Sequence, residues 1–466
     1  MSMGAIDVAL IPSDVLEVCR RLQGAGFEAY LVGGGVRDLV LGRPPKDFDV
    51  ATSAHPEKVM ELFGHRFAIP TGLAHGTVTV ITREAPAGHP VEVTTYRSEG
   101  VYLDGRRPSS VTFGERLEDD LARRDFTMNA IAFDPLAGRL VDPYGGRADL
   151  AARLVRAVGN PIERFEEDGL RPMRAVRQAT QLGFEIHAPT LQAIPATLTS
   201  FRKVSAERVR DELMKILVSP SPARGLELLR ETALLGAIVP ELLEGVGCAQ
   251  NRFHRYDVWG HTMVTLANAD SDGVLRLGAL LHDVGKPRSR QPREGAPGEY
   301  TFFQHEHLGA EMAATICQRL KLANHERDSV RLLVANHMFY YTPEWTDGSV
   351  RRFVKRVGQA ALPLLLALRE ADVVGRGFGE PRSKETEELR RRIDEVASAD
   401  AALSVRDLAI GGKEVMEALG CPPGRLVGRI LDRLLERVLD DPGLNERQRL
   451  LALVPETADE LRASPS

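Results

Sequence analysis

Two aspartates, Asp47 and Asp49, stand two residues apart in the segment KDFDV. In a strand, residues i and i+2 project from the same face, so both carboxylates would converge on one point while the residues between and after them face the core. Carboxylate oxygens are the ligands that Mg²⁺ prefers, and Mg²⁺ often takes its remaining ligands from water and substrate phosphates. Glu92, which has a valine on each side, offers a third carboxylate unless it is a solvated strand residue. By itself such a pair is more often a solvated strand edge, and the surrounding sequence is what favours a metal site.

A glycine-rich turn precedes these aspartates. Three glycines at 33–35 lie between a strand-like run, EAYLV, and a helix-like run, VRDLVLG. Because glycines carry no side chain, backbone N–H groups can approach an anion at the start of the helix, where Arg37 adds a positive charge. Glycines also serve simple tight turns, but beside a carboxylate pair this turn predicts a site for a triphosphate and Mg²⁺.

Histidines and aspartates recur in apolar, helical surroundings in the C-terminal half. An adjacent His-Asp pair with further histidines and a distant aspartate is a ligand set that suits a hydrolytic metal centre, and imidazole favours transition metals. One such histidine is usually a satisfied core residue, but the repeated pattern favours a metal site. The segments are YDVWGHTMVTL (256–266), LHDVGKP (281–287), QHEHLGAEMA (304–313), ANHM (335–338) and READVV (369–374).

The hydrophobic patterns show which elements must position these residues. Residues 13–27 predict a helix that ends at two glycines, and residues 28–32 predict a strand. Beyond Asp149 the strand signals give way to helical periodicity. We therefore expect an α+β chain with an N-terminal mixed α/β domain followed by an all-α region. Three further strand-like runs in the first domain are 46–52, 75–82 and 90–97.

Length and composition exclude several classes of protein. The chain has 466 residues, of which 43% are hydrophobic and 27% charged, so it is neither mainly disordered nor fibrous. The formal net charge of -5 gives no bulk basic character, yet residues 171–215 hold 8 basic and 4 acidic groups. Four widely spaced cysteines predict neither a zinc ribbon nor a disulfide framework, and no signal peptide or membrane span is recognisable. We expect a cytoplasmic protein with no membrane partner.

Four blocks of sequence together resemble the class II tRNA nucleotidyltransferase and bacterial poly(A) polymerase superfamily. They are LVGGGVRDLVLGRPPKDFDVAT (31–52), RRDFTMNAIAFDP (123–135), DPYGGRADL (142–150) and RFEEDGLRPMRAVRQATQLGF (164–184). The resemblance implies a polymerase-β-type nucleotidyltransferase head followed by a helical neck, a body and a tail. The boundaries that we expect are 13–148 for the head, 149–246 for the nucleotide-selecting and RNA-binding neck, 247–378 for the body and 379–466 for a tail that contacts the tRNA body.

The resemblance also implies roles for individual residues. Asp47 and Asp49 would bind two Mg²⁺ ions for in-line phosphoryl transfer. Asp168 and Arg171 match the pair that reads the base; at positions i and i+3 of one helix they would adjoin and offer an acceptor edge beside a donor edge. Such an edge can pair with cytosine or adenine without a nucleic-acid template. The phosphate contacts are implied for Gly34 and Arg37, the triphosphate and ribose contacts for Arg124 and Asp125, and a ridge toward the phosphates for Arg174 and Arg177.

Two residues depart from the family pattern. Pro172 stands where an interior proline would bend a helix, so either the helix begins near Leu170 or it is kinked. Gln178 occupies a position where the family more often has an aromatic residue, which questions the local packing and leaves the polar edge intact.

The resemblance leaves the product partly open. The segment PTGLAHGTVTV (70–80) resembles the tRNA branch of the superfamily more than the poly(A) polymerase branch. The polar stretch at 97–114, with Arg106 and Arg107, resembles the flexible loop of members that add CCA or only the final A. We predict template-independent addition of C, C and A to the 3′ end of tRNA from CTP and ATP; the alternatives are A-only addition and poly(A) synthesis.

The C-terminal histidine segments resemble an HD-domain phosphohydrolase. By that match His261, His282, Asp283 and Asp372 would be primary ligands of a divalent transition metal or Mg²⁺, and His305 and His337 would complete a second metal or bind phosphate. The implied substrates are phosphoester ends, such as cyclic phosphates or a 3′-phosphate. A competing hypothesis makes this domain the physiological enzyme and the head a degenerate RNA-binding module. The sequence is compatible with a homo-oligomer.

Overall fold

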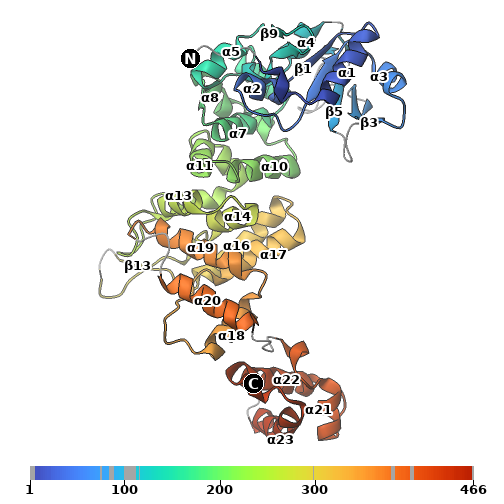
Figure 1. The fold of residues 1–466 in the computed structure, drawn as a ribbon. Helices are drawn as coiled ribbons and strands as arrows, with labels where there is room; N and C mark the ends of the chain where they lie inside the picture. The colour runs from blue at the N-terminus through green and yellow to red at the C-terminus, as the bar shows by residue number, and fades with distance from the viewer. Residues whose placement is uncertain are drawn as a thin grey trace. The chain divides into compact units, whose positions relative to one another are not determined.

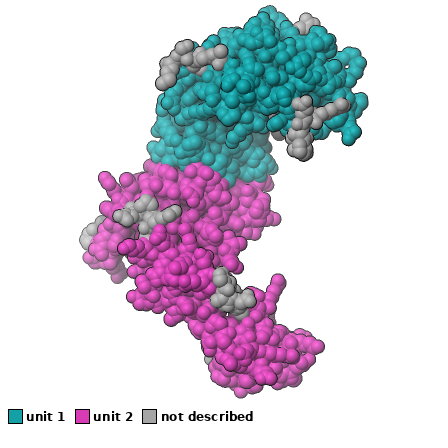
Figure 2. All heavy atoms as spheres, in the orientation of Figure 1, with its two compact units in different colours: residues 1–243 teal, residues 244–466 magenta. Residues whose placement is uncertain are grey.

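The computed structural model describes residues 6–73, 76–82, 89–98, 112–114, 116–296, 299–378, 384–398 and 404–463. The chain divides into two compact units, Met1–Leu243 and Glu244–Ser466, which Figure 2 colours separately. Figure 1 shows that the strands of the large sheet belong to the N-terminal part, whereas the remainder is mainly helical. The expected α+β organisation is thereby confirmed, while the predicted division into four domains stays a prediction.

A seven-stranded sheet forms the head, in the order β3-β4-β5-β2-β1-β8-β9. Strands β2 and β5 are parallel, and every other neighbouring pair is antiparallel. The four predicted strands are present, but the prediction missed β3, β8 and β9, which are short or mostly exposed. The bounds are β1 Ala29–Val32, β2 Asp49–Thr52, β3 Ala68–Gly72, β4 Thr77–Ile81, β5 Pro90–Thr95, β8 Ala132–Asp134 and β9 Arg139–Val141; a separate pair joins β6 Arg97–Ser98 to β7 Thr112–Phe113.

Burial alternates over residues 47–50, at the start of β2, as the sequence predicts. Phe48 and Val50 are buried, at 7% and 0% exposure, whereas Asp47 is exposed and Asp49 half-buried. The strand begins at Asp49 rather than at Lys46, so Asp47 lies in the turn before it. The head helices are η1 Val8–Leu10, α1 Ser13–Gly24, α2 Gly34–Val40, α3 Pro56–Phe63, α4 Leu117–Ala122 and η3 Thr127–Asn129.

Helices α7 and α10 pack together in the rest of the first unit. The expectation that strands end at Asp149 needs a correction: β10 (Leu154–Val155) pairs in parallel with β11 (Glu185–Ile186). Each strand has only two residues, too few to show a period in the sequence. The helices are α5 Gly146–Ala152, α6 Pro161–Glu167, α7 Arg171–Leu182, α8 Ala188–Ala196, α9 Leu198–Phe201, α10 Ala206–Leu217, α11 Pro222–Glu231, α12 Leu234–Ile238 and, across the boundary, η4 Pro240–Gly245.

Among the described residues of the second unit, one hydrophobic cluster is formed mainly by α14 and α17–α20 and another by α21–α23. Helix α18 contacts α22, where Lys355 Nζ pairs with Glu436 at 2.8 Å. Among the described residues, no helix combines the length and the apolarity that crossing a membrane requires. The elements are α13 Val258–Asn268, α14 Gly273–Leu281, α15 Lys286–Ser289, β12 Gln291–Pro292, β13 Tyr300–Thr301, α16 His305–Arg319, α17 Asn324–Asn336, α18 Asp347–Val357, α19 Leu362–Gly375, α20 Lys384–Ser398, η5 Val405–Asp407, α21 Gly412–Leu419, α22 Arg425–Asp440, η6 Pro442–Leu444 and α23 Arg447–Ala463.

Candidate active sites

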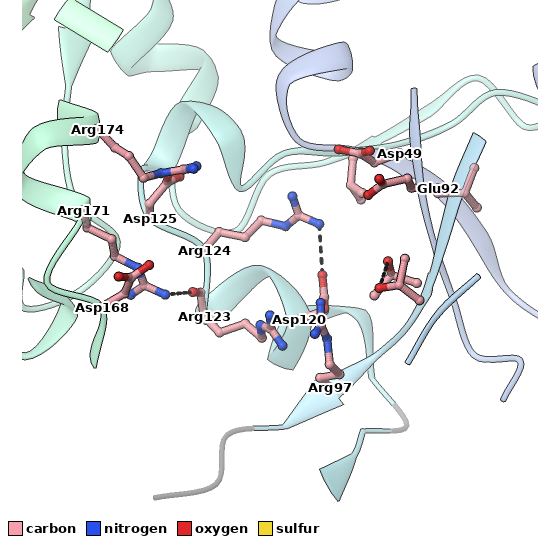
Figure 3. Close-up of a pocket in the computed structure, with 14 residues that line it drawn as sticks. Asp49, Glu92, Arg97, Asp120, Arg123, Arg124, Asp125, Asp168, Arg171 and Arg174 are labelled. Atoms are coloured by element: carbon pink, nitrogen blue, oxygen red, sulfur yellow. Dashed lines mark hydrogen bonds and ion pairs between the residues drawn. The ribbon is translucent and has the colours of Figure 1, made fainter. Parts of the chain in front are cut away.

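A polar cavity of about 330 Å³ opens between the sheet and the helices of the first unit. Carboxylates from β2 and β5 lie at one side of it, and a group of arginines with Asp168 lies at the other, as Figure 3 shows. Arg124 projects between the two groups. The cavity therefore offers carboxylates that can bind a cation and arginines that can bind a polyanion.

The carboxylates converge because of strand register. Asp49 is the first residue of β2, and Glu92 lies directly opposite it on parallel β5. Burial raises the pKa of Asp49 to about 6; Arg124 opposes the shift, while Glu92 and Asp47 add to it. Carboxylates that raise one another's pKa in this way fit a divalent cation, which offsets their repulsion. Asp47 completes the group in the turn before β2 and does not line the cavity.

The glycine turn fits closely against this site. Gly33 has φ +74°, and a Cβ there would lie 3.1 Å from Arg124 Nη1 and 3.3 Å from Asp49 Oδ2. A Cβ at Gly35 would lie 2.9 Å from the carbonyl oxygen of Asp47. Side chains at these positions would displace the carboxylates, so the turn requires glycine.

Gly34 and Arg37 are not among the residues that line the cavity. Arg37 instead donates to Asp38 Oδ1 at 2.9 Å, to Asn129 Oδ1 at 3.2 Å and to Gln178 Oε1 at 3.0 Å. The phosphate-contacting role of Gly34 and Arg37 stays a prediction. Gln178, which stands where the family more often has an aromatic residue, is buried here. Its side-chain oxygen accepts a hydrogen bond from Arg37, and this contact takes the place of aromatic packing.

Asp125 and Arg174 form a close ion pair at the cavity. Arg174 donates from Nε at 2.8 Å and from Nη2 at 2.5 Å to Asp125 Oδ2, and Asn129 Nδ2 donates to Oδ1 at 3.1 Å. Burial alone would raise the pKa of Asp125, but Arg174 and Asn129 hold it below its ordinary value. Asp125 is therefore an anchored acceptor, and Arg174 is oriented by it.

Asp168 and Arg171 lie together in the cavity, but not on one helix as the sequence predicted. Asp168 follows the end of α6 in an extended conformation, and α7 begins at Arg171. The turn between the helices brings them together, and the Arg171 N–H donates to the Asp168 carbonyl at 3.0 Å. Pro172 occupies the first turn of α7, where a missing N–H costs nothing, so the helix starts there and is not kinked by it.

Arg177 lies farther along α7 and does not line the cavity. Its Nε donates at 2.6 Å to Glu212 Oε2, and Glu212 is 3% exposed. Its contact with phosphate stays a prediction. Sequence reasoning overlooked the cavity residues Asp120, Arg123, Thr77, Thr94 and Arg97.

Some of these overlooked residues could have been found from the sequence, and others only from the structure. Asp120 precedes the RRD block by three residues and accepts from Arg124 Nη2 at 3.1 Å, the contact dashed in Figure 3. An i, i+4 acid-arginine pair in LEDDLARRD was the available sequence signal. The hydroxyls of Thr77 and Thr94 lie 3.1 Å apart across β4 and β5, and only the register reveals this contact.

Replacing Gly169 by alanine will destabilise the first unit. A Cβ at Gly169 would lie 2.3 Å from the carbonyl oxygen of Ser200, so the turn that carries Asp168 must move away from α9. We expect a loss of about 1–3 kcal/mol in the free energy of unfolding, measured by urea denaturation. Gly24→Ala is the matched control, because a Cβ at Gly24 meets nothing within 4 Å. Equal stability of the two variants would contradict the close packing of this turn.

The second site is a buried histidine-aspartate cluster in the second unit. Two groups have ligand atoms close enough to hold a metal: His261, His282 and Asp372, and Asp283, His305 and His337. The six residues that the sequence predicted are thereby brought together. Asp283 lies between the groups: its Oδ2 is 3.2 Å from Nε2 of His261 and of His282, and its Oδ1 is 3.3 Å from Nε2 of His305.

The imidazole rings are oriented for coordination. His282, His305 and His337 each direct Nδ1 at a backbone carbonyl oxygen, at 2.8, 2.8 and 2.7 Å. Donation from Nδ1 leaves the Nε2 lone pair for a metal. Within the described part of the chain, the buried Nε2 atoms of His305 and His337 have no hydrogen-bond partner. A pair of cations held between these rings and Asp283 fits the donor set.

Two residues beside the cluster were missed. Lys286 Nζ lies 2.7 Å from Asp283 Oδ2, and burial of Asp283, which alone raises its pKa, is outweighed by His282 and Lys286. The Nδ1 of His254 donates to Asn251 Oδ1 at 3.0 Å, and burial lowers the pKa of His254 to about 3. Lys286 was visible in the motif LHDVGKP, whereas nothing in the sequence near His254 signalled a site.

A cavity of about 270 Å³ leads to this cluster. Asp283, His305, His337 and Asp372 line it together with the cations Lys286, Arg293 and Arg376. Its lining also includes large apolar side chains with high exposure: Phe253 at 57%, Phe303 at 75% and Met338 at 52%. The cavity thus joins a metal-binding end, basic groups and an apolar mouth.

The fold and the two sites define a nucleotidyltransferase-type head joined to an HD domain. Residues 29–156 match the Poly A polymerase head domain, residues 183–245 the Probable RNA and SrmB- binding site of polymerase A, and residues 258–377 the HD domain. The chain is 36% identical over 448 residues to the CCA-adding enzyme of Geobacillus stearothermophilus, covering 95% of this chain and 96% of that protein. The chain belongs to the CCA-adding enzyme family.

Two further comparisons agree. The CCA-adding enzyme of Geobacillus thermodenitrificans is 36% identical over 451 residues, covering 95% of this chain and 96% of the relative. A crystal structure of the Bacillus stearothermophilus CCA-adding enzyme in complex with CTP superposes with a TM-score of 0.72 at 31% identity, over 97% of this chain and 98% of that one. The recognised family and the fold class are confirmed.

Proposed function

We propose that this chain adds C, C and A to the 3′ end of tRNA from CTP and ATP without a nucleic-acid template. The observation that carries the proposal is the head cavity, in which Asp49 and Glu92 face Asp168 and Arg171 across a space lined by arginines (Figure 3). The carboxylate end suits the reacting phosphates, and the opposite end suits the base. The membership of the chain in the CCA-adding enzyme family supports the same reaction.

Asp47, Asp49 and Glu92 would hold Mg²⁺. When bound, Mg²⁺ neutralises triphosphate charge and lowers the pKa of the attacking RNA hydroxyl. Arg124 offers a positive charge between the carboxylates and the base-reading end, where a triphosphate would extend. Asp125 fixes Arg174 for contact with ribose or phosphate, in line with the roles expected for Arg124, Asp125 and Arg174. Arg37 and Gly34 would support the phosphates from the turn before β2.

The base-reading pair presents complementary groups. The carboxylate of Asp168 offers acceptors to an exocyclic amino group, and Arg171 offers donors to a ring nitrogen or carbonyl. Cytosine and adenine both present an amino donor beside an acceptor, whereas guanine and uracil present a carbonyl oxygen in the amino position. One edge therefore accepts CTP and ATP. The polar stretch at 97–114, which resembles the flexible loop of family members, would help to change the choice from C to A; its central residues, 99–111, lie outside the described part of the chain.

Transcripts of tRNA ending at the discriminator base and at CC test the product. With CTP and ATP, we expect three nucleotides to be added to the first transcript and one to the second, read on sequencing gels. Extension of the CC-ended transcript by A alone, with no addition to the shorter one, would establish A-only activity. Long A tracts would establish a poly(A) polymerase.

We further propose that the HD cluster hydrolyses phosphoester ends of RNA, such as a cyclic phosphate or a 3′-phosphate. The oriented Nε2 atoms around Asp283 support a divalent metal, either a transition metal or Mg²⁺. Lys286 and Arg376 suit a phosphate, and exposed Phe253 and Phe303 suit stacking of a base. Such a reaction would restore the 3′-hydroxyl that nucleotide addition uses. The intact polar groups of the head argue against a degenerate RNA-binding module.

The remaining partners follow from the same proposal. Helices α21 and α22, between which the sequence PPG lies at 422–424, would contact the tRNA body, where backbone N–H groups at the start of α22 can meet a phosphate. All four cysteines are free, which supports the cytoplasmic location expected from the sequence. Where basic side chains contact the phosphates of tRNA, binding releases counterions, so tRNA binding should weaken with added salt.

A further inference from the structure

Arg208 connects the neck to the base-reading turn. It lies on α10, forty residues beyond Asp168, and its Nη2 donates to Asp168 Oδ2 at 2.8 Å. The two side chains are 25% and 23% exposed, so the contact is partly shielded from solvent. On the other side of the same carboxylate, Oδ1 accepts the Leu170 N–H at 3.1 Å. Arg208 and the backbone together hold both oxygens of Asp168 in one orientation.

Arg171 is held in a comparable way. Its Nη1 donates to Glu167 Oε2 at 2.6 Å and to the Arg164 carbonyl at 3.0 Å, and its Nη2 donates to the Arg123 carbonyl at 2.9 Å. A guanidinium has five N–H groups, so one on Nη2 and the one on Nε are left over by these bonds among the described residues. Each oxygen of Asp168 likewise keeps one lone pair. The edge is thus oriented before a base arrives and still has capacity to bind one.

The turn itself cannot rotate to compensate for a loose side chain. Gly169 lies against the Ser200 carbonyl, and α10, which carries Arg208, packs on α7, which begins at the end of the turn. The backbone at Asp168 is therefore supported, and the remaining freedom is that of the carboxylate about its own bonds. Arg208 is the side chain that restricts this freedom.

We propose that Arg208 is a positioning residue that determines nucleotide specificity by fixing the carboxylate of Asp168. The inference rests on the proposed reading of the base by Asp168 and Arg171. A fixed pair of acceptors accepts the amino group of cytosine and repels the O4 carbonyl of uracil. Without Arg208, the carboxylate is held by the Leu170 N–H alone and turns away from a uracil, so discrimination falls while the triphosphate contacts remain.

Three variants test this inference: Arg208→Ala, Arg208→Lys and, as the matched control, Arg210→Ala. Arg210 lies on the same helix two residues away, and its guanidinium pairs with exposed Asp211 at 2.8 Å. Steady-state rates with CTP and with UTP are measured on a tRNA transcript ending at the discriminator base. We expect Arg208→Ala to lower the ratio of the two kcat/KM values roughly tenfold, mainly through a higher KM for CTP.

The lysine variant keeps one charged donor, so it should restore part of the selectivity, and Arg210→Ala should keep all of it. Equilibrium dialysis without RNA gives the ratio of the dissociation constants for CTP and UTP, which should change in the same direction. Unchanged selectivity in Arg208→Ala, or an equal loss in Arg210→Ala, would overturn the inference. Absence of nucleotide addition by the unaltered chain would instead refute the proposed function, which keeps the two failures distinguishable.

Discussion

Replacing Asp49 by asparagine will abolish nucleotide addition while leaving the fold intact. Asp49 lies directly opposite Glu92 in the parallel β2-β5 pair and within reach of the Arg124 side chain. An amide offers one oxygen and no charge, so the cation that the three carboxylates would share loses its central ligand. Because such a cation contributes several kcal/mol to phosphoryl transfer, we expect kcat/KM for CTP to fall by about 10³-fold or more.

The Asp49→Asn variant should be as stable as the unaltered chain or more stable, although its activity is lost. Burial and the neighbouring carboxylates raise the pKa of Asp49 to about 6, which means that the folded protein holds this charge less readily than water does. Removing the charge relieves the repulsion from Glu92 and Asp47. Thermal unfolding should therefore occur at the same temperature as in the unaltered chain or above it, and tRNA binding measured by filter retention should persist.

Asp119→Asn is the matched control, since Asp119 is exposed on α4 in the same unit and does not line the cavity. It should retain full activity. If Asp49→Asn keeps more than about a tenth of the wild-type kcat/KM at saturating Mg²⁺, Asp49 is not a metal ligand in this reaction.

At the carboxylate site, the sequence pattern predicted which side chains are buried but not which strands are neighbours. The two-residue spacing of Asp47 and Asp49, with Phe48 and Val50 buried between and after them, correctly predicted which side chains leave the core. It could not show that β2 and β5 are neighbours, because two strands intervene in the chain and pairing is set by tertiary packing. Glu92 therefore remained a candidate until the register placed it opposite Asp49.

The prediction that Asp168 and Arg171, the proposed base-reading pair, lie on one helix was wrong for a different reason. Helical spacing of three residues correctly suggested that Asp168 and Arg171 adjoin, yet the helix ends before Asp168 and a new one starts at Arg171. Gly169 and Pro172 were the local signals for this break, because proline favours the first turn of a helix. The partners of the pair, Arg208 above all, are distant in sequence and leave no spacing to detect.

At the HD cluster, the sequence predicted which residues are ligands but not how they divide between the two metal-binding groups. Six acidic and imidazole side chains converge as the motifs indicated. The resemblance gave Asp283 as a primary ligand, and the structure directs its two oxygens toward two histidine groups. Whether a carboxylate faces one group or two depends on how five helices pack, namely α13, α14, α16, α17 and α19, and periodicity along a single helix contains no information about that packing.

Replacing Asp283 by asparagine will remove metal from the HD cluster without affecting nucleotide addition. Asp283 supplies both of its oxygens to the space between the histidines, and Lys286 lies 2.7 Å from one of them. An amide withdraws the negative charge, so the Lys286 ammonium then faces the metal-binding imidazoles without compensation. We expect the metal content, measured by elemental analysis after dialysis, to fall to near zero, and any metal-dependent hydrolysis of a 3′-phosphorylated or cyclic-phosphate RNA end to disappear with it.

Asparagine is chosen before alanine because it keeps the volume of a fully buried side chain, whereas alanine would also leave a cavity beside an unpaired lysine. His307→Ala is the matched control: His307 lies in the same helix as His305, its side chain is 69% exposed, and it belongs to neither metal-binding group. That variant should keep its metal and its hydrolysis. CCA addition should be equal in all three proteins, because the head cavity lies in the other compact unit. A simultaneous loss of addition in a folded Asp283→Asn protein would show that the two sites are not independent, and retention of metal would show that Asp283 is not a ligand.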